Sequence, residues 1–412
     1  MKILIMNASD VKGGAAKVGY LLAKGLIERH HEVCYLVKNQ SVSDSFIQEI
    51  PAPKEKSSSR SIPERIIHRL GINELGLTNP FPYQLERDFL KQFDLIHLHD
   101  LPSFNLSGLP WLTRQVPTVW TLHSMAPFTG NCSYSYDCDR WQKNCGNCPQ
   151  FGQFPLLWYH RDGSRLNLNL KRLIYRFSNL HIVGVSQWIS DAARQSVFGH
   201  LPVSTILNPV QTDNFFPIAD KLALRQELNI PLDASVILFS VSGKIEDNRK
   251  GLDLMLAALP QLALDDIYLI PLGIAGNSKK ISEAFAPYAH RNFEHISDVV
   301  LLNKLLNAAD VVWHPSRADN LPLMVIEAFA AGTPVIAAAV GGVPEIMGDR
   351  DVGLSITPDS SQALVEATQI FFRRSPKERQ IMGERAVSYA IETFSLDQFL
   401  TAHETLFKSL LP

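Results

Sequence analysis

Short, continuous runs of hydrophobic residues alternate along this chain with longer stretches in which hydrophobic residues recur every three or four positions. The first pattern is typical of a strand that is buried on both faces, and the second is typical of an amphipathic helix. At the start, a run over 2–6 is followed by Gly13-Gly14 and then by helical spacing from Val18 to Leu26. Regular alternation of this kind predicts an α/β fold with parallel sheets. Further strands are predicted at 32–37, 95–98, 118–122, 179–185, 203–207, 236–241, 267–272, 310–313 and 335–339.

The alternation is interrupted at 208–217, where two prolines stand in a segment without periodicity. Such a segment is typical of a linker between domains. We therefore expect a Rossmann-like N-terminal domain over 1–209, a Rossmann-like C-terminal domain over 210–392 and a terminal helix over 393–412. Open parallel sheets bind ligands beyond the carboxyl ends of their strands, so the two doubly wound domains are expected to face each other across a cleft.

Composition constrains the size, the partners and the location of the protein. A chain of 412 residues is too long for one ordinary domain and fits two. Lys and Arg total 39 against 41 Asp and Glu, which argues against a nucleic-acid-binding protein. No apolar run reaches the roughly 18 residues of a membrane-spanning helix, and the apolar start is too short for a signal peptide. We expect a cytoplasmic protein.

Candidate chemistry is concentrated between His314 and Glu345, in the stretch HPSRADNLPLMVIEAFAAGTPVIAAAVGGVPE. Asp319 and Glu327, with seven residues between them, lie on either side of a predicted helix start near Pro322. Carboxylates accept hydrogen bonds from sugar and ribose hydroxyls. Helix N-termini and glycine loops bind phosphate. The stretch therefore predicts a site for a polyhydroxylated, phosphate-bearing molecule.

This stretch resembles the signature of the retaining glycosyltransferases with the GT-B fold, known as group 1 or family 4. The resemblance implies two Rossmann-like domains facing across a cleft and a terminal helix that returns to the N-terminal domain. It implies that Glu327 binds the ribose, that Asp319 binds the transferred sugar, and that the N–H groups of Asn320, Leu321 and Leu323 lie near the β-phosphate. The family has Glu where this chain has Asp319. A plain helix cap is the alternative role for Asp319, but it does not account for Glu327.

Two glycines and two lysines are candidates for binding the donor pyrophosphate. Gly13 and Gly14 open the first predicted helix, where glycine lets the backbone approach a phosphate; an ordinary tight turn is the alternative. Lys244 and Lys250 fit a clamp that neutralises the leaving diphosphate, and a solvated basic loop is the alternative. The resembled family usually has Arg at the first of these positions, and lysine cannot form the bidentate fork of arginine. Arg249 lies nearby but not at the family position.

His123 directly follows the predicted strand over 118–122. An isolated histidine more often has a structural hydrogen-bonding role, but the resemblance places a histidine facing the sugar across the cleft. We therefore assign His123 to the catalytic residues, together with Asp319 and the two lysines. His99, at the end of the preceding predicted strand, is a weaker second candidate.

Four of the five cysteines fall within 17 residues, in the segment GNCSYSYDCDRWQKNCGNCPQ: Cys132, Cys138, Cys145 and Cys148. Four thiolates complete a tetrahedral zinc shell, so a structural zinc site is the favoured interpretation. Free thiols are the next interpretation, and two disulfides come last because a cytosolic setting disfavours them. Similar cysteine-rich inserts occur in some bacterial polysaccharide-biosynthesis glycosyltransferases, which the chain resembles in this respect.

A basic and aromatic segment over 156–176 has two interpretations. Its arginines, lysines, tyrosines and tryptophan would suit peripheral contact with an anionic membrane, at the inner face of the cell membrane. An ordinary amphipathic helix packed on the first sheet is the favoured alternative.

The resemblance covers nearly the whole chain and implies a hexosyltransferase-type enzyme. It would move a sugar with retention from a UDP- or GDP-linked donor to a hydroxyl of a glycan or lipid-linked acceptor, in polysaccharide biosynthesis and without a cofactor for catalysis. Two alternatives stay open: a nucleotide-sugar epimerase with this architecture, and a non-catalytic subunit with a decayed site.

Overall fold

The structure is a computed structural model that describes residues 1–50, 62–72, 75–77, 79, 81–100, 104–153, 161–241, 248–273, 283–294 and 296–411. The chain divides into two compact units: unit 1 is Met1–Asn208 with Phe399–Pro412, and unit 2 is Pro209–Gln398. The sequence predicts these divisions at 209/210 and 392/393. Each unit is built on one parallel sheet, so the predicted α/β class with two Rossmann-like domains is confirmed.

Unit 1 contains a seven-stranded sheet in the order β3-β2-β1-β4-β5-β6-β7, in which every neighbouring pair is parallel. Strands in the middle of the sheet are covered on both faces, which is why Leu4, Ile96 and Val119 are fully buried. Its strands are β1 (Lys2–Ser9), β2 (Glu32–Asn39), β3 (Ile47–Glu49), β4 (Leu95–Leu98), β5 (Thr118–Leu122), β6 (Leu180–Gly184) and β7 (Val203–Thr205).

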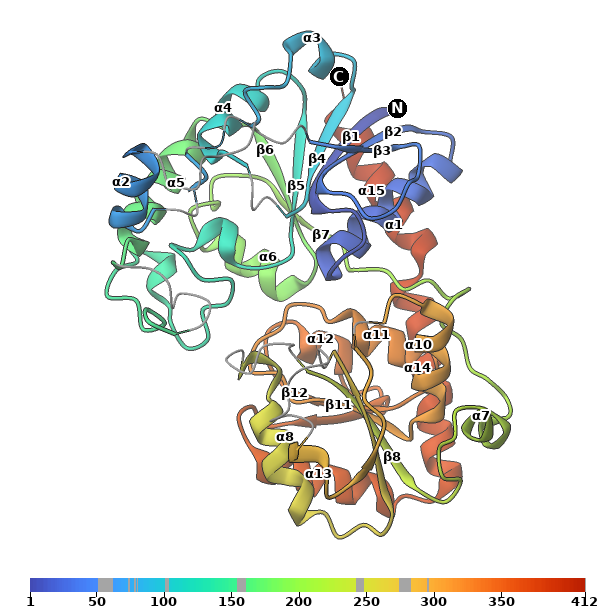
Figure 1. The fold of residues 1–412 in the computed structure, drawn as a ribbon. Helices are drawn as coiled ribbons and strands as arrows, with labels where there is room; N and C mark the ends of the chain where they lie inside the picture. The colour runs from blue at the N-terminus through green and yellow to red at the C-terminus, as the bar shows by residue number, and fades with distance from the viewer. Residues whose placement is uncertain are drawn as a thin grey trace. The chain divides into compact units, whose positions relative to one another are not determined.

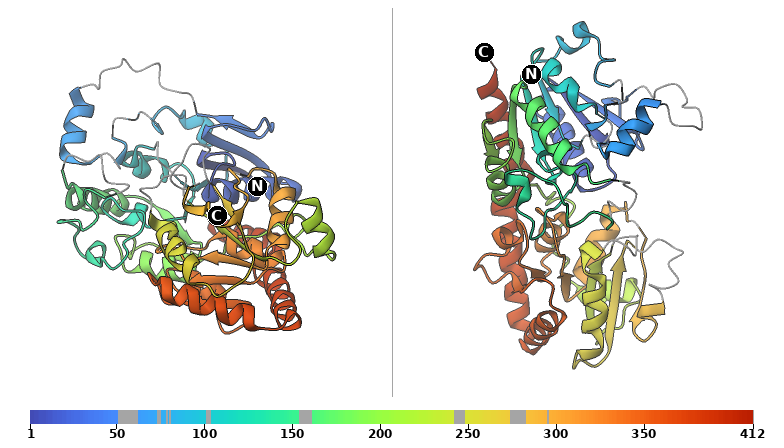
Figure 2. Two further views of the ribbon diagram at one scale, coloured as in Figure 1. Left: turned by 60° about the horizontal axis from the view of Figure 1, so that its bottom comes forward. Right: turned by 90° about the vertical axis from the view of Figure 1, so that its left-hand side faces the viewer.

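The last helix of the chain, α15 (Leu396–Leu410), packs against α1 in unit 1, and Figures 1 and 2 show the two ends of the chain close together. Leu400 contacts the bare face of α1 at Gly25, where an added Cβ would come within 2.5 Å of it. Glu404 pairs with Arg29 at 3.0 Å and with His31 at 2.7 Å. The other helices of unit 1 are α1 (Gly14–Glu28), α2 (Ile62–Leu70), α3 (Arg87–Leu90), α4 (Leu109–Leu112), α5 (Ser164–Arg176) and α6 (Gln187–Arg194).

Unit 2 contains a six-stranded parallel sheet in the order β10-β9-β8-β11-β12-β13, with α8 and α13 on one face and α10 and α14 on the other (Figure 1). Its strands are β8 (Ser235–Ser240), β9 (Ile267–Leu272), β10 (Ala289–His290), β11 (Val311–His314), β12 (Val335–Ala338) and β13 (Gly353–Ile356). Its helices are α7 (Lys221–Glu227), α8 (Leu252–Ala258), α10 (Val299–Ala308), α11 (Leu323–Ala330), α12 (Val343–Met347), α13 (Ser361–Arg373) and α14 (Pro376–Phe394).

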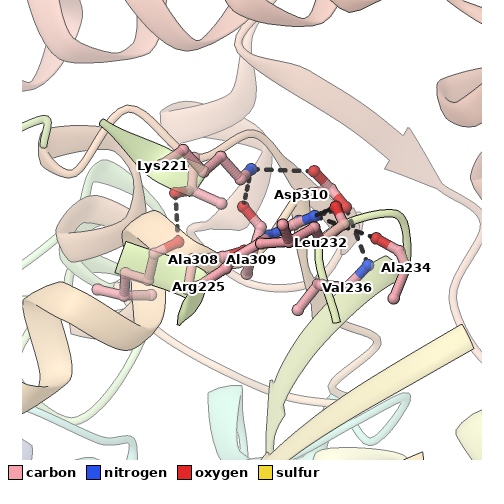
Figure 3. A network of polar contacts seen from close by, with 10 residues as sticks. Lys221, Arg225, Leu232, Ala234, Val236, Ala308, Ala309 and Asp310 are labelled. Atoms are coloured by element: carbon pink, nitrogen blue, oxygen red, sulfur yellow. Dashed lines mark hydrogen bonds and ion pairs between the residues drawn. The ribbon is translucent and has the colours of Figure 1, made fainter. Parts of the chain in front are cut away.

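A buried polar network fixes the amino end of the central strands in unit 2 (Figure 3). The guanidinium of Arg225 donates to the carbonyl oxygens of Ala308, Leu232 and Ala234 and to Asp310 Oδ2. Asp310 also accepts the backbone N–H of Val236 at 2.9 Å. The network joins α7, β8 and the start of β11, and it lies at the opposite end of the strands from the carboxyl ends that carry candidate residues.

The sequence did not predict three strands, β3, β10 and β13. All three are the outermost strands of their sheets, and each is four residues or shorter. An edge strand has less buried surface than a central one, so it lacks the continuous apolar run that reveals a central strand.

Candidate functional site

In unit 2 a basic turn lies against the loop that connects β11 to α11. The turn is a short 3-10 helix over Asn248–Lys250 that ends at Gly251. Gly251 has a φ of 71°, and a Cβ there would lie 2.3 Å from the carbonyl oxygen of Pro315, so only glycine permits this close approach. The backbone N–H of Arg317 donates to the carbonyl oxygen of Arg249 at 2.8 Å.

The side chain of Arg317 also stabilises this turn through polar contacts. Its Nη1 atom donates to the carbonyl oxygen of Asn248 at 2.8 Å, and its two Nη atoms form a bidentate pair with Asp253 at 2.7 Å each. Its Nε atom donates to Asp359 at 2.7 Å. The rigid fork of arginine suits this geometry, and the contacts link the basic turn to the first turn of α8.

The carboxylate of Asp319 contacts two cationic side chains and a histidine in this region. Its Oδ2 atom lies 2.9 Å from Lys250 Nζ, 3.5 Å from Arg249 Nη1 and 3.3 Å from His314 Nε2. Burial alone would raise the pKa of Asp319, but Lys250, His314 and Arg249 outweigh it and hold that pKa well below its usual range. The carboxylate is therefore ionised at neutral pH. It lies beside Lys250 and Arg249, two cations of the kind that bind phosphate.

The helix that follows Asp319 begins without a side-chain cap. Its N-cap residue is Pro322, and Asp319 instead accepts the N–H of its neighbour Asn320 at 3.0 Å. Asp319 is thus not the cap of α11, contrary to the alternative interpretation. Glu327 lies midway along α11 and is only 5% exposed. Leu321, also buried, and Leu323, the first residue of α11, stand at the helix start as the sequence predicts.

In unit 1 the loop after β1 ends in a glycine with positive φ that has open space beside it. Gly13 has a φ of 98° and precedes α1, which begins at Gly14. A Cβ placed on Gly13 would meet no atom within 4 Å, so the backbone conformation, rather than crowding, favours glycine here. Asp10 is fully buried and accepts the N–H groups of Val11 and Val42, which anchors the start of this loop.

His123 belongs to a cluster of four histidines that the sequence did not predict. His99 and His123 follow neighbouring parallel strands, and His99 Nδ1 lies 2.9 Å from His123 Nε2. The ring centroid of His97 lies 4.4 Å from that of His99. The ring centroid of His403, on α15, lies 5.4 Å from that of His97. Burial, with a smaller contribution from His403, lowers the pKa of His123 to about 3. His123 is therefore neutral at neutral pH.

The four clustered cysteines, Cys132, Cys138, Cys145 and Cys148, line one small cavity beside α5, and none of them is in a disulfide. As the side chains stand, no group of three or more His, Cys, Asp or Glu within the described ranges is arranged to hold a metal ion. The zinc interpretation stays a prediction.

The structure brings Lys250 and Asp319 into contact, and it places Gly13, Gly14 and His123 in unit 1. Lys244 lies outside the described residues. His314 and Arg317 also contribute to this geometry and were not among the predicted site residues, although both stand in the same signature stretch.

Comparison with known proteins decides the family. A model described as Glycosyltransferase Family 4 matches residues 12–214, and one described as Glycosyl transferases group 1 matches residues 220–388. The D-inositol 3-phosphate glycosyltransferase of Corynebacterium aurimucosum is 30% identical over 375 residues, which cover 87% of this chain and 79% of that protein. The chain belongs to the group 1 glycosyltransferases. The colanic acid biosynthesis glycosyl transferase WcaC of Escherichia coli K12 is 24% identical to this glycosyltransferase, over 90% of each chain.

Solved structures establish that the glycosyltransferase has the GT-B fold. Sucrose-phosphate synthase from Thermosynechococcus elongatus superposes with a TM-score of 0.72 at 19% identity, over 99% of this chain and 98% of that one. The Anabaena HepE protein in complex with UDP-glucose superposes with a TM-score of 0.68 at 17% identity, over 99% and 100%. Across the part of the chain that the structure describes, no helix has the length and apolarity to cross a membrane.

Proposed function

We propose that this glycosyltransferase moves a sugar from a nucleotide-sugar donor to a hydroxyl acceptor with retention of the anomeric configuration. The observation that carries the proposal is the contact of Lys250 and Arg249 with the buried carboxylate of Asp319, next to the start of α11. Paired cations beside an ionised acid suit a ligand that carries both phosphates and hydroxyls.

Each group has a separate task in this proposal. Lys250 and Arg249, with Lys244 as the sequence predicts, neutralise the diphosphate as it leaves, which is where negative charge develops. Asp319 exchanges its contact with Lys250 for hydroxyls of the transferred sugar. Glu327 accepts hydrogen bonds from the ribose.

The acceptor hydroxyl attacks on the face from which the diphosphate departs, and the diphosphate takes up its proton. Retention follows from this front-side attack. No cofactor is required, because positioning and charge stabilisation supply the acceleration. Neutral His123 contributes a hydrogen bond to the sugar, and Gly13 and Gly14 permit close approach of the backbone to the pyrophosphate.

A UDP-linked sugar is the first donor to test, since HepE has been solved with UDP and with UDP-glucose. A GDP-linked sugar is the alternative. For the acceptor we propose a growing glycan, free or lipid-linked, because WcaC is named for colanic acid biosynthesis.

A lipid-linked acceptor would bring the protein to a membrane surface, and α5 offers a suitable face. Leu166 and Leu173 of this helix and Phe177, directly after it, are 40%, 55% and 53% exposed. Arg172 and Arg176, also exposed, adjoin them. Apolar side chains beside arginines suit the surface of an anionic membrane. Co-sedimentation with phosphatidylglycerol vesicles, lost in Leu173→Glu, is the expected result; equal recovery with neutral vesicles would contradict it.

The deciding experiment compares Glu327→Ala and Asp319→Ala by calorimetry with UDP and GDP and by turnover with the matching sugar donors. Glu327→Ala should weaken nucleoside diphosphate binding, because a ribose acceptor is lost. Asp319→Ala should lower turnover and barely change nucleotide affinity. Exposed Glu366, on α13, supplies the control Glu366→Ala, which should match the wild type.

Three outcomes would contradict the proposal. Equal behaviour of the two variants would refute the division of roles. Conversion of a nucleotide sugar to an isomer without an acceptor would indicate an epimerase. Tight nucleotide binding without transfer to any glycan acceptor would indicate a non-catalytic subunit.

A further inference from the structure

The two carboxylate oxygens of Asp319 have different partners. Oδ1 accepts the backbone N–H of Asn320 at 3.0 Å, which ties it to its own loop. Oδ2 lies within 3.5 Å of three side chains, two of which, Lys250 and Arg249, belong to the basic turn. The third is the imidazole of His314, whose Nε2 atom is 3.3 Å away. Of these three partners, only His314 lies outside the basic turn.

His314 is held by the core of unit 2. It is the last residue of β11, which lies between β8 and β12 in the middle of the sheet, and it pairs with Ala337 of β12. Its side chain is 1% exposed. The basic turn, by contrast, has no buried residue between Asn248 and Lys250. A side chain on a packed central strand is positioned more rigidly than one on a polar turn.

A nucleoside diphosphate would compete for the two cations but not for the imidazole. Phosphate oxygens accept hydrogen bonds from lysine and arginine as a carboxylate does. Burial lowers the pKa of His314, although Asp319 opposes this effect, so the ring is neutral at neutral pH and does not attract phosphate. A neutral imidazole whose Nε2 atom carries the hydrogen can still donate to a carboxylate oxygen.

Asp319 needs such a donor when the cations turn to the diphosphate. Its side chain is only 11% exposed, and a buried carboxylate that loses its cationic partners carries a large desolvation cost. Nε2 of His314 is itself buried and makes no well-aligned hydrogen bond to the residues that the structure describes. This atom is therefore available to Oδ2, and a small rotation of either side chain would align the two.

We propose that His314 is a positioning residue for Asp319. Once the donor diphosphate draws Lys250 and Arg249 away, Nε2 of His314 donates a hydrogen bond to Oδ2 and keeps the carboxylate in place. The bonds from His314 and Asn320 occupy two of the roughly four lone pairs of the carboxylate, which leaves acceptors for sugar hydroxyls. The proposal rests on the proposed function, in which the two cations bind the diphosphate and Asp319 binds the sugar.

The test measures the binding of UDP and GDP by calorimetry in the full-length protein. His314→Leu should raise the Kd of the nucleoside diphosphate that the wild type binds by about tenfold or more, because the buried carboxylate then loses its remaining donor. In an Asp319→Ala background the same substitution should change the Kd little, since a residue that acts through Asp319 has nothing left to position. A histidine that only fills the core would give equal losses in both backgrounds.

Two further variants complete the design. His314→Gln should restore most of the affinity and of the kcat that His314→Leu loses, because the glutamine amide nitrogen can take the place of Nε2. Half-buried His181, near the amino end of β6 in unit 1, is hydrogen-bonded to Ser204 and supplies the control His181→Leu, which should match the wild type. If His314→Leu does not fold, His314→Asn replaces it, because its shorter amide does not reach the position of Nε2.

Two results would overturn this proposal alone: additive losses in the two backgrounds, or equal losses in His314→Leu and His314→Gln. The cycle is measured by binding, so it is decided whether or not sugar transfer is detected. A wild type that binds neither UDP nor GDP would overturn the proposed function and this proposal together.

Discussion

At the scale of single residues, the proposed donor site of this glycosyltransferase contains a few ionic contacts made through one carboxylate oxygen. Asp319 Oδ2 lies 2.9 Å from Lys250 Nζ, so under the proposed function an entering diphosphate would compete with Asp319 for Lys250. Lys250 is the nearer of the two cations, because Arg249 stands at 3.5 Å. We therefore expect Lys250 to carry the larger share of charge stabilisation.

Lys250→Ala should reduce turnover by on the order of 10²–10³, the usual effect of losing one preorganised charge in an active site. Lys250→Arg keeps the charge and should recover part of the rate. Steady-state kinetics with a saturating donor measures the effect, and circular dichroism checks that the fold is kept. Wild-type turnover in Lys250→Ala would remove this residue from the site.

A second prediction concerns the pair of histidines in unit 1. Because His99 Nδ1 and His123 Nε2 share one hydrogen bond, the tautomer of one ring fixes that of the other. We propose that His99 is a positioning residue for His123. His99→Leu should lower kcat by about tenfold or more with little change in the donor KM, since the bond would orient the histidine that the proposed function places at the sugar.

His99→Asn is the matched variant, because its amide can occupy the place of Nδ1 and should restore most of the rate. Equal losses in the two variants would assign His99 a purely structural role. A rise in donor KM without a fall in kcat would also contradict the positioning role.

At the scale of elements, the basic turn is tied to the loop between β11 and α11, because Arg317 of that loop contacts the turn. Arg317 lies between β11 and α11, yet its side chain holds the carbonyl oxygen of Asn248 and both carboxylate oxygens of Asp253. The turn has no hydrophobic core of its own: no residue of Asn248–Lys250 is buried. Its position is therefore set by polar contacts and by the close approach at Gly251.

Arg317→Lys keeps the charge but loses the fork. Misplacement of the turn should lower kcat/KM for the donor by up to about 100-fold, while the melting temperature changes little because ion pairs near the surface contribute about 0–1 kcal/mol. Arg385→Lys makes the same chemical change at an ion pair with Asp351 and serves as the control. Equal kcat/KM values in the two variants would show that Arg317 does not set the geometry of the turn.

At the scale of the whole molecule, the chain ends in the unit where it began, and its last helix buries the histidine cluster. The ring centroids of His403 and Phe407 on α15 each lie 5.4 Å from that of His97. Burial lowers the pKa of His403 to about 4 and holds the pKa values of His97 and His99 well below their usual range. These histidines are neutral in the folded protein and titrate near pH 6.5 when the chain is unfolded.

Acidification should therefore destabilise unit 1. Between about pH 6.5 and the lowered folded pKa, the unfolded chain binds more protons than the folded one, so the free energy of unfolding falls as pH falls. Each buried histidine contributes about 1.4 kcal/mol per pH unit. Urea denaturation at several pH values from 7.5 to 4.5 measures the slope.

His403→Asn should reduce this slope by the contribution of one histidine, because the amide does not titrate. The exposed His30 supplies the control His30→Asn, which should keep the wild-type slope. An unchanged slope in His403→Asn would mean that His403 is not buried in its neutral form.

The sequence by itself determined the class of the fold and most of its central strands. The strands predicted at 95–98, 118–122 and 267–272 coincide with β4, β5 and β9, because a strand covered on both faces is mostly apolar along its length. It also determined the helix start after Pro322, since local chemistry sets where a helix begins. The family signature depends on spacing within one stretch, so it too could be read from the sequence.

Only the tertiary structure decided which distant side chains meet. Arg249 reaches Asp319 across 70 positions, and His403 packs on His97 from the far end of the chain. The convergence of four cysteines on one cavity and the clamp made by Arg317 are of the same kind. Hydrophobic periodicity reports the burial of a residue along its own element, whereas these contacts arise from the packing of separate elements, which no local pattern encodes.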